Sequence, residues 1–381
     1  MRRIGRESMK FVLQVSTGSF SGCSVPDIGK MKNQLENLIR RLPVSRIIFG
    51  WGSKPGLSEA LTGLAKKYGI EVLLWLPVLA DTEWPDSGEP LKAIRTGIAK
   101  QVTTCPGEAF RFMCPNSEKN FALVLASYER LAQEYPADGV FLDRIRYPSA
   151  VYSPFDLFGC HCEKCGKLYR EIGVDEARLH KKVSAVGGLA AFLPSRMENG
   201  RYHYADEDME LLSEMKRQSI LRLVQRLTDH FHQKGLIVGI DAFAPCLSDC
   251  VGQDLERLAG VVDFIKPMMY YRTTAPAGVP YEMTAYGDAF AHQVSALWGT
   301  DAAQPSSMEA QLRSLKGKAA ILPGIEVNSI PGICEPKEED FASSLRAISG
   351  AGCTEAVLCW DVLKAPEVHI RSIENALSGI T

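Results

Sequence analysis

The sequence has no long apolar run and a net charge close to zero. None of its apolar runs approaches the roughly 20 residues that a membrane-spanning helix needs. The basic start, "MRRIGRESMKFVLQVSTG", lacks the apolar region and the small-residue cleavage site of a secretory signal. The formal net charge of −2 gives no electrostatic reason to expect binding to nucleic acid or to an anionic membrane. We therefore expect a cytoplasmic protein.

A phosphate-binding glycine loop is also missing. The loop "GWGSKPG" has the wrong glycine spacing, so nothing favours a nucleotide or another organic cofactor. By contrast, cysteine is frequent, with eleven in the chain. In a reducing compartment this number indicates metal binding or buried thiols rather than disulfides.

The 381 residues alternate between apolar, β-branched runs and segments with helical periodicity. The expected strands are 10–18, 45–53, 70–80, 139–148, 236–245, 262–271, 320–328 and 355–363. Eight such units, with strands that are apolar on both faces, predict an α/β protein with a (β/α)8 TIM barrel forming a single catalytic domain over 10–381. An open doubly wound sheet is the competing fold, but it would need fewer strands and a phosphate loop.

Two connections are much longer than the others. Residues 81–118 follow the third expected strand, and residues 149–206 follow the fourth. In a barrel of this kind, insertions after strands lie at the C-terminal face, where the active site is built.

Three cysteines stand close together in "FGCHCEKCGKLY", namely Cys160, Cys162 and Cys165. This spacing allows the thiolates to bind one tetrahedral zinc ion. The fourth ligand is expected from Cys114 in "FRFMCPNSEKN", with Cys105 and His161 as alternatives. Four unlinked buried thiols are the other interpretation. Four thiolates would close the coordination sphere, so this zinc would be structural.

The pattern "RFMCPNS", followed by C-x-C-x-x-C after the fourth strand, resembles the zinc site of the family 42 β-galactosidases. In those barrel glycosidases a cysteine from the region after the third strand joins a cluster further along the chain. The resemblance implies a Zn²⁺ ion that holds the two insertions together at the rim of the active-site face.

Several expected strands end in a charged residue. Alternation along "ADGVFLDRIRYPS" directs Asp143 into the barrel mouth, and the same rule directs Asp241, Glu326, Asp361 and Lys266 inward. Such acids can also be loop caps or partners of arginines.

A pair of carboxylates across a barrel mouth is what the cleavage of a glycosidic bond requires. We expect Asp143 as general acid/base and Glu326 as nucleophile, with the reverse assignment open and Asp241 as the reserve carboxylate. A separation of about 5 Å predicts retention of configuration, which we expect, and about 6.5–9.5 Å predicts inversion.

Aromatic and cationic residues near the strand ends suit a sugar subsite, because flat apolar faces stack on pyranose rings. Trp75 is expected in the core instead. The expected substrate-binding residues are Arg146, Lys266, Tyr270, Trp360, Asp361 and Trp51.

The stretch "DGVFLDRIRYP" resembles the strand-four motif Asp-Gly-x-x-x-Asp-x-Ile-Arg-Tyr-Pro of a group of glycoside-hydrolase-like barrels. "VDFIKPMMYY" and "PGIEVN" fit the sixth and seventh strands of that group. The resemblance implies a sugar-cleaving barrel with Asp143 as a principal catalytic residue. Glycosidases of the large barrel clan carry a glutamate after strands four and seven; Glu326 fits the second, but strand four offers Asp143 and no Asn-Glu pair.

Two other functions stay open. Lys266 lies where Schiff-base aldolases of barrel fold keep their lysine. A non-catalytic carbohydrate-binding barrel would keep the cleft without the chemistry. The expected partner is a carbohydrate, with no nucleic acid and no membrane, and a homo-oligomer is compatible with the sequence.

Overall fold

The computed structural model describes residues 9–16, 27–50, 56–81, 88–92, 94, 101–105, 108–151, 156–185, 192–315 and 317–379, with only the backbone described for 81, 101–105, 108–110 and 156. Trp51, one of the expected substrate-binding residues, lies outside these ranges, and so does the side chain of Cys105. None of the described helices is both long enough and apolar enough to cross a bilayer.

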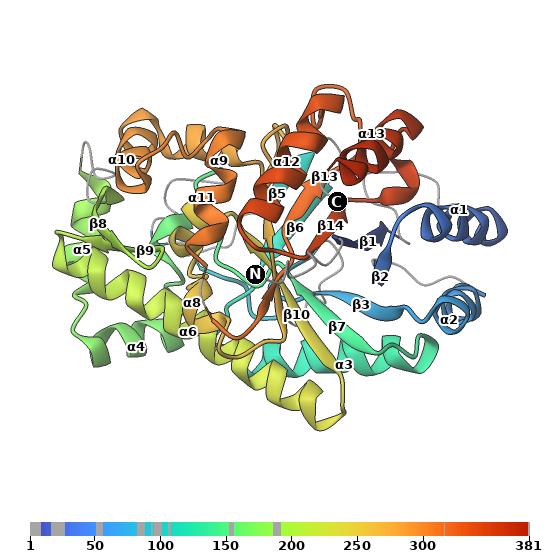
Figure 1. Cartoon of the computed structure of the whole chain (residues 1–381). Helices are drawn as coiled ribbons and strands as arrows, with labels where there is room; N and C mark the ends of the chain where they lie inside the picture. The colour runs from blue at the N-terminus through green and yellow to red at the C-terminus, as the bar shows by residue number, and fades with distance from the viewer. Residues whose placement is uncertain are drawn as a thin grey trace, which may run out of the picture.

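A closed barrel of eight parallel strands forms the centre of the molecule, which confirms the predicted (β/α)8 fold (Figure 1). We call each of the eight strand positions around the barrel a stave, because one position is shared by two short strands. Every stave pairs with its neighbour in chain order, and the last stave returns to the first. The staves are β1 (Lys10–Ser16), β2 (Val44–Gly50), β3 (Glu71–Pro77), β7 (Gly139–Asp143), β10 (Ile237–Phe243), β11 (Phe264–Met268), β12 (Ala320–Ile321) with β13 (Gly324–Glu326), and β14 (Glu355–Cys359).

The barrel interior is filled by aromatic rings. Phe141 and Phe264 stack with centroids 6.0 Å apart, and Trp75 meets Phe141 edge-on at 6.5 Å. Gly239 makes room for these rings, because a Cβ at that position would lie 1.9 Å from the ring of Phe264. Trp75 is buried, as predicted. The interior below the mouth is therefore a packed core.

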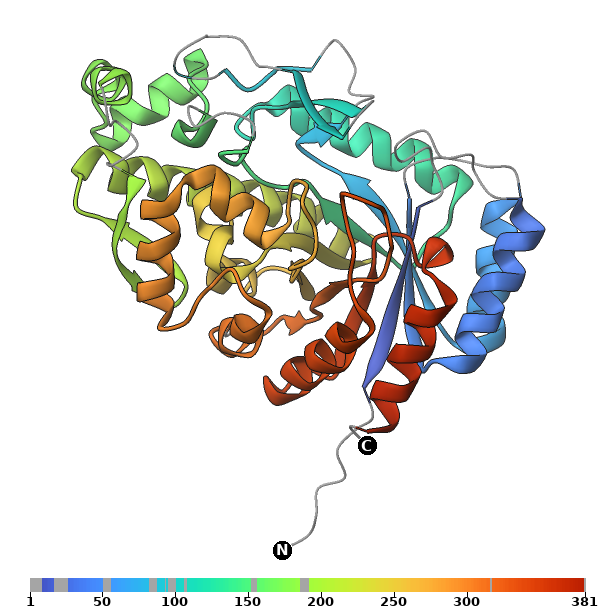
Figure 2. The same ribbon diagram turned by 90° about the horizontal axis from the view of Figure 1, so that it is seen from above.

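Helices surround the staves (Figures 1 and 2). Asp27, Ser117 and Asp206 accept hydrogen bonds from backbone N–H groups and so cap the starts of α1, α3 and α6. The helices that follow or flank the staves are α1 (Ile28–Arg41), α2 (Leu57–Tyr68), α3 (Glu118–Glu134), α6 (Glu207–Gln233), α7 (Pro245–Ser248), α8 (Leu255–Leu258), α9 (Val279–Tyr286), α10 (Asp288–Trp298), α11 (Met308–Arg313), α12 (Glu338–Gly350) and α13 (Glu367–Ser378).

The two long connections carry structure of their own. The first contains the antiparallel strands β4 (Ala80–Asp81), β5 (Gln101–Cys105) and β6 (Glu108–Phe112). The second contains α4 (Glu163–Ile172), α5 (Glu176–Ser184) and the hairpin β8 (Pro194–Glu198) to β9 (Arg201–Tyr204). Figure 2 shows α4, α5 and the hairpin at one end of the molecule, where β8 contacts α10.

Candidate active site and cysteine cluster

Asp143 is the last residue of β7 and lies at the C-terminal end of the barrel, almost fully buried. Its Oδ2 accepts a hydrogen bond from Trp75 Nε1 at 2.9 Å, and its Oδ1 accepts from the backbone N–H of Arg144 at 2.5 Å. Arg144 has a φ of 53°, a conformation that costs energy for a residue with a side chain. Two donors thus orient both oxygens of this carboxyl group.

Lys266 lies on β11 with its side chain completely buried. Its ammonium donates to Asp241 Oδ2 at 2.9 Å, to Tyr270 Oη at 2.8 Å and to Gln14 Oε1 at 3.3 Å. Burial acts to lower the pKa of Lys266. The negative charge of Asp241 and the effects of other neighbours together outweigh burial, so the pKa of Lys266 is raised. Lys266 is therefore a protonated side chain that uses all three of its N–H groups.

Asp241, on β10, is the carboxylate partner of Lys266. Burial, assisted by the negative charge of Asp143, raises the pKa of Asp241 to about 7 in spite of the lysine. Its Oδ1 has no hydrogen-bond partner among the described residues. The side chain of Gln253 is buried next to Asp241. Its Nε2 donates hydrogen bonds to the backbone oxygens of Asp241 and Ile145, and these two bonds connect β10 to the segment after β7.

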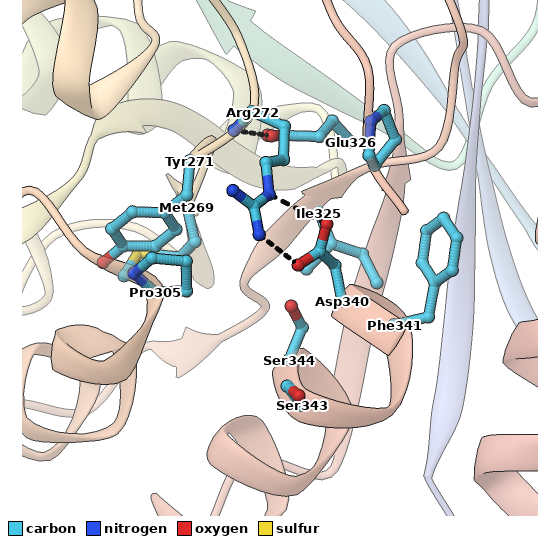
Figure 3. Close-up of a pocket in the computed structure, with 11 residues that line it drawn as sticks. Met269, Tyr271, Arg272, Pro305, Ile325, Glu326, Asp340, Phe341, Ser343 and Ser344 are labelled. Carbon is cyan, nitrogen blue, oxygen red and sulfur yellow. Dashed lines mark hydrogen bonds and ion pairs between the residues drawn. The ribbon is translucent and has the colours of Figure 1, made fainter. Parts of the chain in front are cut away.

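Glu326 ends β13 and is also almost fully buried. Burial raises the pKa of Glu326 to about 8, against the effect of a hydrogen bond from the backbone N–H of Arg272 to its Oε1. Its Oε2 has no partner within the described part of the chain. No described hydrogen bond or ion pair joins Glu326 to Asp143 or Asp241. Instead it lines a small cavity beside α12 (Figure 3).

The end of β14 contributes an aromatic and an acidic residue. Trp360 is half-buried and meets the ring of Tyr270 edge-on, with centroids 5.9 Å apart. Asp361 lies 3.1 Å from Lys364 in an ion pair, and burial raises the pKa of Asp361. Asn328 holds both backbones, because its Oδ1 accepts from the N–H groups of Trp360 and Asp361 at 2.7 and 3.0 Å.

Asn328, Gln253 and Gln14 were not predicted from the sequence. The only signal for Asn328 is its position two residues after Glu326 at the end of an apolar run. Gln14 interrupts the apolar run "KFVLQVS" at an inward position, which is a detectable signal for a polar residue in a barrel strand.

Arg146 follows β7 but is buried between aromatic rings rather than open at the mouth. Its guanidinium lies 4.4 Å from the ring centroid of Phe243 and 5.2 Å from that of Phe112, and it donates to the backbone oxygen of Tyr147. The carboxyl group of Glu282 on α9 is buried, and burial raises its pKa. The positive charge of Arg146 acts in the opposite direction and lowers the pKa of Glu282. A direct contact of Arg146 with substrate stays a prediction.

Four thiols from the two long connections meet at one place. The Sγ atoms of Cys114, Cys160, Cys162 and Cys165 all lie within 4.8 Å of one another. Cys114 Sγ lies 3.7 Å from Cys162 Sγ and 3.6 Å from Cys165 Sγ. A tetrahedral site with zinc–sulfur bonds of about 2.3 Å has sulfur–sulfur edges of about 3.8 Å. The donor set and its dimensions therefore fit a tetrahedral metal ion.

The surroundings of the cluster also suit sulfur ligands. Asn116 Nδ2 donates to Cys165 Sγ at 3.4 Å, and the backbone N–H of Lys92 donates to Cys160 Sγ at 3.5 Å. His161, an alternative ligand from the sequence, uses its two ring nitrogens with Phe158 O and Glu176 instead. Cys114 is thus the fourth member of the cluster among the described residues.

Comparisons with known proteins agree with the fold. No protein-family model matches the sequence, and no curated protein is similar to it in sequence. The structure is similar to the glycoside hydrolase domain of PgaB (BpsB) from Bordetella bronchiseptica, with a TM-score of 0.57 and 13% identity over 97% of this chain and 99% of that chain.

It is also similar to α-L-fucosidase isoenzyme 2 from Paenibacillus thiaminolyticus, with a TM-score of 0.56 and 12% identity over 98% of this chain and 49% of that chain. For the spore cortex-lytic enzyme SleL from Bacillus megaterium the TM-score is 0.50, with 8% identity over 97% of this chain and 75% of that chain. The structural neighbours are glycoside hydrolases, and at these identities the likeness shows the barrel fold.

Proposed function

We propose that this protein is a glycoside hydrolase whose chemistry is carried by carboxyl groups at the barrel mouth. The observation that carries the proposal is a difference between two strand-end acids. Glu326 is buried with its pKa raised to about 8, whereas Asp143 receives hydrogen bonds on both oxygens. Glycosidic cleavage needs one carboxyl group that bears a proton and a second that is ionised.

The proposed roles follow from these environments. Glu326 bears a proton at neutral pH and is the general acid, while Asp143 is the nucleophile or the base. This is the second of the two assignments that the sequence left open. Asp241, with a pKa of about 7, is the reserve carboxyl group. Trp360 and Tyr270 would face the sugar, with Asp361 and Arg146 as further substrate-binding residues.

We propose a retaining mechanism. The test is to follow the hydrolysis of an aryl glycoside by proton NMR, which reveals the anomer that is released first. Release of the opposite anomer would replace retention with inversion.

The Schiff-base alternative is disfavoured by Lys266 itself. An amine attacks a carbonyl only when it is unprotonated, whereas the pKa of Lys266 is raised by the charge of Asp241 despite its burial. We expect no adduct on Lys266 after borohydride treatment with carbonyl substrates. A trapped adduct would restore the aldolase hypothesis.

We propose Zn²⁺ as the ion held by Cys114, Cys160, Cys162 and Cys165. The precedent is the zinc site of the family 42 β-galactosidases, which the cysteine spacing resembles. Zinc with four thiolates has no open position, so its role would be to hold the two insertions together. Four clustered free thiols also suit a reducing compartment such as the cytoplasm.

The experiment is a screen of aryl glycosides with wild type, Asp143→Asn and Glu326→Gln. Each substitution should lower kcat/KM by at least about a hundredfold while circular dichroism and metal content stay unchanged. Glu335→Gln, which neutralises an exposed glutamate after β13, is the control and should behave as wild type. Wild-type rates in both site variants would overturn the assignment, and sugar binding without turnover would favour the non-catalytic barrel.

A further inference from the structure

A small cavity lies beside Glu326 on the helix side of the barrel wall (Figure 3). Its volume is about 30 Å³, which is room for about two water molecules. Its lining comes from the segment after β11, from β13 and from α12, and it includes Arg272, Asp340, Ser343 and Ser344. Glu326 therefore borders a small space between β13 and α12 whose lining is partly apolar and partly polar.

A continuous set of bonds connects Glu326 to α12. The backbone N–H of Arg272 donates to Glu326 Oε1. The guanidinium of the same residue binds both oxygens of Asp340, with Nε at 2.8 Å and Nη2 at 2.6 Å. Asp340 lies in the first turn of α12 and also accepts from the N–H of Lys337 at 2.8 Å. This bidentate ion pair anchors the segment whose N–H binds Glu326.

Four other groups near Glu326 are uncharged at neutral pH, and the charged Lys266 lies behind one of them, at 2.8 Å from Tyr270 Oη. They are the hydroxyls of Tyr270 and Tyr271 after β11, the thiol of Cys334 between β13 and α12, and the thiol of Cys359 on β14. Burial raises the pKa of Cys334 to about 12 and the pKa of Cys359 to about 11. Arg272 and Asp340 are thus two charged neighbours of Glu326, and they have opposite signs.

We infer that Arg272 and Asp340 are positioning residues for Glu326. Their ion pair fixes the N–H that binds the carboxyl group, and their opposed charges hold the balance between its proton-bearing and ionised forms. This inference rests on the proposed role of Glu326 as the acid. The Arg272–Asp340 salt bridge, which lies outside the barrel mouth, would then influence how readily Glu326 donates its proton.

The test follows the proton on Glu326 directly. Infrared difference spectra between wild type and Glu326→Gln isolate the band of the protonated Glu326 carboxyl, and its titration needs no substrate. Asp340→Asn should move the midpoint to lower pH, because Arg272 then stands as an uncompensated positive charge. Arg272→Gln should move it to higher pH, because Asp340 then stands alone.

Each single substitution should change the ratio of protonated to ionised Glu326 at fixed pH by about threefold, a modest effect because solvent screens a side chain as exposed as Arg272. The double variant should return close to the wild-type midpoint. The amide oxygen that Asp340→Asn introduces can still accept from the N–H of Lys337, so this substitution should keep the start of α12. The control is Glu338→Gln, which neutralises an acid of the same helical turn that binds Ser372 instead.

Midpoints that stay at the wild-type value in both folded single variants would overturn the inference, as would shifts in the same direction. The alkaline limb of the rate profile on the hydrolysed aryl glycoside should move with the infrared midpoint. If Glu326→Gln keeps full activity while the infrared shifts occur, the proposed role of Glu326 fails and the positioning stands. If Glu326→Gln is inactive and the midpoints do not move, only the positioning fails.

Discussion

At the scale of single residues, the feature on which the proposed chemistry depends is a carboxyl group that is buried without a full set of hydrogen-bond partners. Glu326 and Asp241 each have one oxygen with no hydrogen-bond partner among the described residues. Loss of hydration disfavours the charged form, so the pKa of each is raised, to about 8 and about 7. Such groups can carry a proton at neutral pH, when exposed carboxyls are ionised.

The raised pKa of Glu326 predicts how stability depends on pH. Its ordinary pKa is 4.5, so between about pH 4.5 and about pH 8 the folded state binds a proton that the unfolded state releases. The free energy of unfolding therefore falls as pH rises through this window. Glu326→Gln removes the effect and should be more stable than wild type at about pH 9, by an amount on the order of a few kcal/mol. Thermal unfolding at about pH 5 and about pH 9 measures it; an equal difference at both pH values would contradict the prediction.

Lys266 predicts a second effect on stability. Lys266→Met leaves Asp241, Tyr270 and Gln14 without their shared buried donor, and we expect a loss of roughly 3–5 kcal/mol in the free energy of unfolding. The matched control is Lys364→Met, which breaks the partly exposed ion pair with Asp361 and should cost at most about 1 kcal/mol. Urea unfolding of both variants gives the comparison. Similar losses in the two variants would show that Lys266 is not the centre of the polar cluster.

At the scale of elements, the space inside the barrel limits the size of the side chains that the strands can direct inward. Side chains from β7 and β11 fill the interior at the level of Gly239 on β10, so that this stave approaches them closely. Above that layer β7 ends in Asp143, and β10 and β11 carry Asp241 and Lys266 side by side. The polar residues at the barrel mouth therefore lie directly on the packed aromatic layer, and that layer supports them.

Gly239→Ala should destabilise the protein by about 1–3 kcal/mol, because its Cβ would overlap the ring of Phe264 and force the core to move. Gly63→Ala is the matched control. Gly63 is exposed within α2 and an added Cβ there meets nothing within 4 Å, so alanine should stabilise the helix by roughly 0.5–1 kcal/mol. Chemical denaturation measures both changes. The prediction is wrong if Gly239→Ala is as stable as wild type.

At the scale of the whole molecule, the cysteine cluster joins two insertions that leave different staves. Cys114 stands between β6 and α3, whereas the other three cysteines lie at the start of α4, about 50 residues later in the chain. Further contacts join the same insertions, such as the hydrogen bond from the N–H of His161 to Lys92 O at 2.7 Å. With the proposed metal ion, the cluster would cross-link these two insertions.

Removal of one ligand should separate the two insertions and leave the barrel folded. Cys114→Ser is expected to lower the zinc content per chain and to make the 149–206 insertion more sensitive to limited proteolysis, with the far-ultraviolet circular dichroism largely kept. The control is Cys353→Ser, a half-buried thiol outside the cluster. Unchanged metal content in Cys114→Ser would contradict the proposed ligand set, and metal analysis of wild type checks the identity of the ion.

The sequence by itself determined the eight staves, the position of the two insertions and the four cysteines. These features are local: an apolar run, a helical period or a C-x-C-x-x-C spacing is complete within a short segment. The inward direction of Lys266 and Asp241 also follows from alternation along one strand, and the structure joins them in an ion pair.

Only the tertiary structure decided which partners each charged side chain meets. Gln14 reaches Lys266 across 252 positions of the chain, and Arg272 binds Glu326 and Asp340 from a segment far from both. The burial of Arg146 between Phe243 and Phe112 is of the same kind. No local pattern encodes such contacts, because closure of the barrel brings distant parts of the chain together, and burial there then raises the pKa of Asp241 and of Glu326.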